Sequence, residues 1–142
     1  MTPTIQLVTL GSLEMRLAEA EFPPASLPLP ATAKSQSLLV YLAVHRRKPH
    51  LRDHLADLFW GERPEQKARR SLSTALWHIR RCLPDDAILA DQSTVQFNGA
   101  NPLWLDSEAF QAAAAGSDLA DMEAAAALRR GDFLDGFYDD WV

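Results

Sequence analysis

The sequence predicts an α+β fold, with an N-terminal antiparallel sheet, three helices, a β-hairpin and a further helical segment. Apolar residues first alternate with polar ones and then change to helical spacing near residue 33. Strand-like alternation returns near residue 87, after the third helix. Charge divides the chain as well. Residues 45–83 carry ten Lys and Arg against four Asp and Glu, although the net charge of the whole chain is −5.

The length of 142 residues and the hydrophobic content of 47% allow one full core and the start of a second. We therefore predict two domains, at residues 1–100 and 101–142. No run of 18 apolar residues occurs, and residues 1–10 lack the features of a secretory signal, so we expect a cytoplasmic protein with no membrane contact. The single cysteine, Cys82, lies within an amphipathic pattern and is expected to be a buried core thiol.

Two half-buried strands are predicted before residue 20. Residues 5–10 and 13–17 alternate apolar and polar side chains, and Gly11 and Ser12 between them indicate a tight antiparallel turn. Residues 25–30 alternate too, but their prolines cannot donate to a ladder. This stretch is either an edge strand or a polyproline-type linker.

Three helices are predicted in the basic third of the chain. The first begins near residue 33 and is stopped by Pro49, and the second covers residues 51–60, before Gly61. The third covers residues 64–83, with a proline in its first turn. The side chains expected to face inward are Leu51, Leu55, Leu58, Phe59 and Trp60 in the second helix, and Leu72, Leu76, Ile79 and Leu83 in the third.

The opposite face of the third helix carries hydrogen-bonding and cationic side chains. This chemistry suits the base edges and phosphates of a DNA major groove. The alternative is a basic face that is merely solvated. The residues of this face are Arg70, Ser73, Thr74, Trp77, His78 and Arg81, with Arg69 and Arg80 at its margins. The Trp77 ring has two alternatives: core packing, which is usual for aromatic rings in small domains, or contact with a sugar or a phosphate from the exposed face.

A β-hairpin is predicted after the third helix. Residues 87–90 and 94–98 are short strand-like segments on either side of a polar turn, Asp91-Gln92-Ser93. A helix–turn–helix followed by a hairpin is a winged helix, a common DNA-binding arrangement. Topology and local charge thus both indicate binding of nucleic acid.

These elements resemble a family of bacterial regulators. Residues 51–60 (LRDHLADLFW) and 68–83 (ARRSLSTALWHIRRCL) resemble the OmpR/PhoB-type winged helix of SARP/AfsR-like transcriptional activators, and residues 10–15 (LGSLEM) are similar to its opening strands. Residues 104–110 (WLDSEAF) and 128–141 (LRRGDFLDGFYDDW) resemble the start of the family's bacterial transcriptional activation domain, an array of TPR-like helical repeats.

We therefore expect the chain to be an N-terminal fragment of a longer regulator, because one helical repeat cannot bury its apolar face alone. We expect the helical segment after about Asp118 to be marginal, and either to lean on the winged helix or to mediate self-association. The apolar residues expected to lack the next repeat are Leu119, Met122, Phe133, Phe137 and Trp141.

The resemblance implies a sheet of about four antiparallel strands on a three-helix core, with the third helix in the major groove and the wing near the adjacent minor groove. It implies head-to-tail dimers on direct repeats of double-stranded DNA. The implied DNA contacts are Arg69, Arg70, Ser73, Thr74 and Arg81, with Arg52 on a phosphate. The loop at 61–66 is the implied contact with RNA polymerase, through Gly61, Glu62, Arg63 and Glu65.

The sequence gives no support for catalytic or metal-binding chemistry. His50 and His54 have a spacing that can hold zinc, but no Glu follows the first histidine and no cysteine pair or third ligand is near. Phosphate contact or an ordinary surface position is the expected role of both. No nucleophile, phosphate-loop or dinucleotide motif occurs, so we expect no enzyme activity, no cofactor and no metal.

The sequence thus predicts a sequence-specific DNA-binding transcriptional activator. The rival interpretation is a winged-helix interaction module whose basic face docks an acidic protein surface, which residues 118–142 of the chain itself could supply. Residues 84–142 have a net charge of −10, so we also expect them to weaken DNA binding by like-charge repulsion at low salt.

Overall fold

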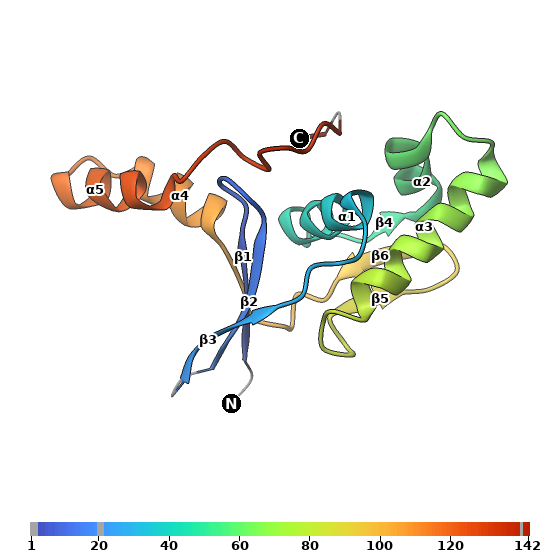
Figure 1. The fold of residues 1–142 in the computed structure, drawn as a ribbon, viewed down its shortest axis with the longest axis horizontal. Coiled ribbons are helices and arrows are strands. Elements are labelled where there is room, and N and C mark those ends of the chain that lie inside the picture. Colours follow the sequence, from blue (N-terminus) through green and yellow to red (C-terminus); the bar gives the residue numbers. More distant parts are fainter. Residues whose placement is uncertain (1–2, 20–21, 140) are drawn as a thin grey trace. The chain divides into compact units, whose positions relative to one another are not determined.

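The computed structural model describes residues 3–19, 22–139 and 141–142. These residues form two compact units (Figure 1). The helical unit comprises residues 28–101 with 139–141, and the sheet unit comprises the chain up to residue 27 with 102–138 and 142. This grouping differs from the predicted domains at 1–100 and 101–142. Which segment folds by itself stays a prediction, because compactness does not test it.

Three helices build the core of the helical unit: α1 (Ala33–Val44), α2 (Arg52–Trp60) and α3 (Glu65–Arg80). A capping box begins α1, in which Thr32 and Ser35 each accept a hydrogen bond from the other's backbone N–H. The apolar stripe predicted for the third helix is buried, and so is Trp60. However, α3 ends at Arg80 and not at residue 83, so Leu83 is buried from the turn that follows the helix. The fully buried side chains of the three helices include Leu38, Leu39, Leu42, Leu55, Phe59, Leu72 and Ile79.

An antiparallel sheet completes the helical unit, in the order β4 (His50–Leu51), β6 (Thr94–Phe97), β5 (Ile88–Ala90). The predicted hairpin is present as β5 and β6, which we name the wing. The sequence did not predict β4. Because His50 and Leu51 alternate across this short strand, His50 is buried and Leu51 is 61% exposed. The prediction that Leu51 faces the core is therefore wrong.

The sheet unit contains four strands in the order β3 (Phe22–Leu27), β2 (Glu14–Glu19), β1 (Thr4–Val8), β7 (Leu103–Leu105). The first three are antiparallel neighbours, and β3 is an edge strand that contains residues 25–27 of the segment predicted at 25–30, whereas residues 28–30 lie outside it. However, β7 pairs with β1 in parallel, so the sheet is mixed and not wholly antiparallel. A parallel partner needs a long crossover, and here it arrives from a segment far along the chain.

Asp106 attaches the following helices to the start of the chain. Its buried carboxylate accepts hydrogen bonds from the N–H and Oγ1 of Thr9, both at 2.8 Å, and from the N–H of Leu10 at 2.9 Å. The Thr9 carbonyl in turn accepts from the N–H of Leu134 at 2.7 Å. Asp106 begins α4 (Asp106–Ala114), so these bonds fix the position of that helix relative to β1.

The helix α5 (Leu119–Leu128) packs against α4 and confirms a helical segment after Asp118. Leu119 and Met122 are 69% and 62% exposed, so most of each apolar side chain faces away from the packed surface of α5. The α+β class is therefore confirmed. That α4 and α5 begin a series of repeats stays a prediction.

Cys82 is half-buried, whereas the sequence predicted a fully buried thiol. Its partial burial raises the pKa of the thiol, and the nearby Arg81 acts in the opposite direction.

The described part of the chain contains no helix with the length and hydrophobicity that a membrane span needs.

Candidate nucleic-acid interface

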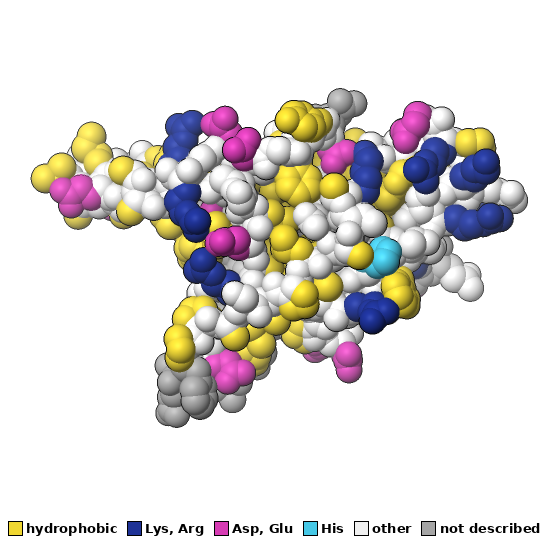
Figure 2. All heavy atoms as spheres, in the orientation of Figure 1, with side chains coloured by type: hydrophobic (Ala, Val, Ile, Leu, Met, Phe, Trp, Pro, Cys, Tyr) yellow, Lys and Arg dark blue, Asp and Glu magenta, His cyan; other side chains and the backbone are white. Residues whose placement is uncertain are grey.

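The outer face of α3 carries the residues that the sequence assigned to DNA. Arg70, Ser73, Thr74 and Arg81 are exposed and His78 is half-buried. Trp77 is 54% exposed, as an apolar ring on a solvent-facing helix surface. On the face shown in Figure 2, Lys and Arg side chains gather over α2 and α3. The position of these side chains is as predicted, and their binding of DNA stays a prediction.

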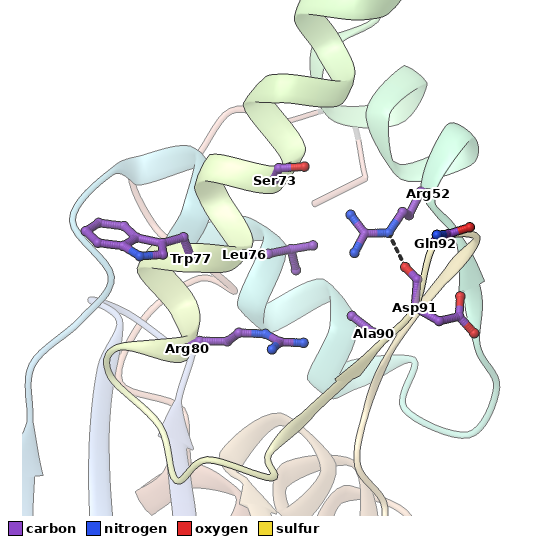
Figure 3. Close-up of a pocket in the computed structure, with 8 residues that line it drawn as sticks. All are labelled: Arg52, Ser73, Leu76, Trp77, Arg80, Ala90, Asp91 and Gln92. Carbon is purple, nitrogen blue, oxygen red and sulfur yellow. Dashed lines mark hydrogen bonds between the residues drawn. The ribbon is translucent and has the colours of Figure 1, made fainter.

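A hollow of about 640 Å³ lies between α3 and the wing (Figure 3). Ser73 and Arg80 line it from α3, Arg52 from α2 and Gln92 from the tip of the wing. The guanidinium groups of Arg52 and Arg80 extend toward it from different elements, whereas the Trp77 ring points away. Three elements thus present polar groups to one space. Gln92 was missed as a site residue because only its place in a turn was visible in the sequence.

Arg52 fastens the tip of the wing. Its Nε donates to the Asp91 carbonyl at 2.6 Å, and its backbone N–H donates to the Ser93 carbonyl at 2.9 Å. The Asp91 carboxylate closes the turn by accepting from the N–H groups of Thr94 at 2.7 Å and Ser93 at 2.8 Å. These backbone hydrogen bonds, led by that of Thr94, lower the pKa of Asp91 below its ordinary value. The wing tip is therefore held in one shape.

The predicted cations of α3 differ in their surroundings. Arg69 forms ion pairs with Asp53 at 3.0 Å and with Glu65 at 2.8 Å, so its guanidinium already has two carboxylate partners. Arg81 stacks over the Trp77 ring with 4.6 Å between the guanidinium carbon and the ring centroid. Arg70 forms no ion pair or hydrogen bond with any residue that the structure describes. It is the best placed of the three to take a new partner.

The loop predicted to contact RNA polymerase lies at the surface between α2 and α3. Its residues Gly61, Glu62 and Arg63 are exposed, and Glu65 is exposed in the first turn of α3. Arg63 is held by the Ser71 hydroxyl, which accepts from Nη1 at 2.7 Å. The loop is accessible in the helical unit, and its contact with polymerase stays a prediction.

A second hollow, of about 350 Å³, is lined by residues of α1, α3 and the loop before α3. Its cationic members are Lys34, Arg63 and Arg70, and the imidazole of His78 and the hydroxyl of Thr74 also line it. Lys34 was not predicted as a site residue, because it is the only base of α1 and lies apart from the basic cluster at 45–83. Only the packing of α1 against α3 brings it there.

The histidines with zinc spacing are placed differently from each other. His54 is exposed, but His50 is buried, so a surface position is wrong for His50. Its Nε2 donates to the carbonyl of His45 at 2.8 Å, a structural role. Burial first, and then His50 and Lys48, lower the pKa of His45. In the described ranges of the chain, no three His, Cys, Asp or Glu side chains are grouped to hold a metal ion.

Comparison with known proteins gives a likeness in fold. No protein-family model matches the sequence, and no curated protein matches it. The structure is similar to that of Mycobacterium tuberculosis EmbR in complex with a low affinity phosphopeptide, with a TM-score of 0.65 and 22% sequence identity. The match covers 94% of this chain and 38% of the EmbR chain. At this identity the likeness shows a shared fold.

Proposed function

We propose that this chain belongs to a transcriptional regulator and that it binds double-stranded DNA sequence-specifically, with α3 in the major groove. The observation that carries the proposal is the convergence of α2, α3 and the wing on one hollow beside the exposed face of α3. Arg, Ser and Thr side chains on a helix suit base edges, and cations at the margins suit phosphates. The local excess of Lys and Arg outweighs the negative net charge of the chain at short range.

Within this proposal, the regulator is an activator of the SARP/AfsR-like kind. It binds direct repeats head to tail and contacts RNA polymerase with the loop at 61–66. The sequence resemblance supports these finer points, whereas the fold shared with EmbR supports only the coarser proposal of a transcriptional regulator. We propose no enzyme activity for the chain, because its sequence contains no catalytic motif, and a cytoplasmic location, which binding to DNA in a bacterial cell requires.

The decisive experiment selects bound duplexes from a random pool and compares the best one with a random duplex in competition. We expect a preference of about 10³-fold or more. Both measurements need the same salt concentration, because binding to phosphates falls steeply with salt. Equal affinity for the two duplexes would contradict sequence-specific binding.

The second candidate function is a protein-interaction module that binds acidic surfaces. The observation that favours it is the pairing of basic side chains with carboxylates within the helical unit, as Arg69 does with Asp53 and Glu65. This candidate predicts equal affinities for selected and random duplexes. It also predicts tight, salt-dependent binding of an acidic protein segment.

A further inference from the structure

Asp139 and Trp141 belong to the helical unit and lie against α1 and α2. Trp141 Nε1 donates to the Ser37 hydroxyl at 2.9 Å. The Trp141 ring meets the Tyr41 ring nearly at right angles, with 5.2 Å between the centroids, and lies 6.4 Å from the Phe59 ring. An aromatic cluster and a hydrogen bond therefore anchor Trp141, which corrects the expectation that it lacks a packing partner.

Asp139 reaches a cation from the same position. Its carboxylate forms an ion pair with the ammonium of Lys34, and the Asp139 side chain is only 14% exposed. The Lys34 ammonium also lies 6.0 Å from the centroid of the Phe59 ring. We name Asp139 and Trp141 the clasp, because both bind the helical unit near the start of α1.

Lys34 also lines the hollow of about 350 Å³ that contains Arg63 and Arg70. Three cationic side chains around one space raise its positive potential. An anion is therefore attracted more strongly to this hollow than to an isolated lysine. Arg70 has no partner among the described residues, whereas Arg63 donates to Ser71 and has the exposed carboxylate of Glu62 at 4.0 Å from its Nε. The clasp neutralises the third cation.

We propose that this hollow binds a phosphate of the DNA backbone and that Asp139 competes with that phosphate for Lys34. The inference rests on the proposed function and deepens it, because it adds a backbone contact on α1 and a contact within the chain that weakens binding. Arg70 and Thr74 line the hollow and also belong to the outer face of α3. A helix seated in the major groove has phosphates along its flanks, where Lys34 then lies.

The charges fix the direction of the effect. A phosphate oxygen is a strong acceptor for ammonium and guanidinium groups, and a bound carboxylate occupies the same donors. When Asp139 holds Lys34, one fewer cation faces the duplex. Removal of the Asp139 charge therefore strengthens binding to every sequence, and it increases the salt dependence by about one phosphate contact.

The experiment measures duplex affinity by fluorescence anisotropy for the 142-residue chain and for Asp139→Asn, Lys34→Gln and the double variant. Asn keeps the shape of Asp and leaves Trp141 in place. We expect Asp139→Asn to bind selected and random duplexes roughly 3–10-fold more tightly, with a steeper salt slope. In the Lys34→Gln background the same change should have no effect, because Asp139 weakens binding only through its ion pair with Lys34, which that background already lacks.

Asp135→Asn is the matched control. The substitution removes the same charge from the chain, but Asp135 is exposed and lies outside the helical unit. Trp141→Ala is the second variant, because it releases the clasp without changing charge and should also strengthen binding in a Lys34-dependent way. Thermal unfolding of each variant verifies the fold.

Two results would overturn the inference alone: duplex binding by the wild type that Asp139→Asn leaves unchanged, and an equal gain from Asp135→Asn. Absence of duplex binding in every folded variant would overturn the proposed function and the inference together.

Discussion

The guanidinium of Arg69 joins α3 to α2 by binding the carboxylate of Asp53 at 3.0 Å. Glu65, one turn earlier on α3, binds the same guanidinium at 2.8 Å. All three side chains are more than half exposed, so each pair adds at most about 1 kcal/mol to stability. The larger consequence is electrostatic, because two carboxylates lower the positive potential at a cation assigned to DNA.

Replacing Asp53 by Asn should therefore strengthen binding to random duplexes, by roughly 2–5-fold at low salt. Arg69 keeps one carboxylate, and the thermal unfolding temperature should change little. Asp57→Asn is the control, since it removes a charge from the same helix without a contact to Arg69, and it should have a smaller effect. Equal gains in duplex affinity from both changes would show that the effect comes from overall charge and not from the release of Arg69.

Arg70 is the residue on α3 most suited to a base contact, because it is exposed and unpaired among the described residues. Replacing Arg70 by Ala should cost about 1–3 kcal/mol on a selected duplex and relax the preference at one base pair. Arg47→Ala removes an exposed charge outside α3 and should weaken all duplexes alike. A uniform loss from Arg70→Ala would instead assign that residue to the phosphate proposed for the hollow that Arg70 lines together with Lys34.

Arg52 has two roles that substitutions can separate. Its Nε is bound to the Asp91 carbonyl, which leaves its terminal nitrogens for a phosphate. Arg52→Ala should weaken all duplexes, reduce the salt slope by about one, and increase hydrogen exchange at the wing-tip amides. Arg52→Lys should restore the salt slope but not the protection, because one ammonium cannot serve both partners. Unchanged hydrogen-exchange protection of the wing-tip amides in Arg52→Ala would show that the wing keeps its structure without the Arg52 side chain.

The sequence was sufficient where the determining interactions are local. The buried stripe of α3 follows from residue spacing along one helix, and the exposed face opposite it follows from the same spacing. The wing was visible because its two strands are joined by a short polar turn. Arg70, Thr74 and Trp77 are therefore placed as predicted.

The remaining features depend on contacts between distant segments. The parallel pairing of β7 with β1 joins residues nearly a hundred positions apart, and hydrophobic alternation does not select a partner strand. The ion pairs Arg69–Asp53 and Lys34–Asp139 likewise depend on tertiary contacts. The first forms because α3 packs against α2, and the second because the segment with Asp139 lies against α1. The inward prediction for Leu51 failed because the chain is still a strand at that residue.

His45 predicts a pH dependence of stability. Its pKa in the folded chain is lowered by burial and by the nearby His50 and Lys48. As pH falls below about 6.5, the unfolded chain takes up the proton first, so stability present above that pH is lost as pH falls through the folded pKa. We expect a lower melting temperature at pH 5 than at pH 7.5, and a smaller drop in His45→Gln. An equal drop in both proteins would assign the effect to other groups.

Asp106 predicts the largest stability effect in the sheet unit. Ala at this position leaves the N–H groups of Thr9 and Leu10 without their acceptor in a buried place, which should cost about 2–4 kcal/mol. Asn still offers one oxygen to Thr9, but its amide nitrogen cannot accept from Leu10, so its loss should be smaller. Hydrogen exchange at the Thr9, Leu10 and Leu134 amides measures the effect locally. Unchanged protection in Asp106→Ala would mean that the cost of burying the carboxylate cancels the three hydrogen bonds, and that packing alone positions α4.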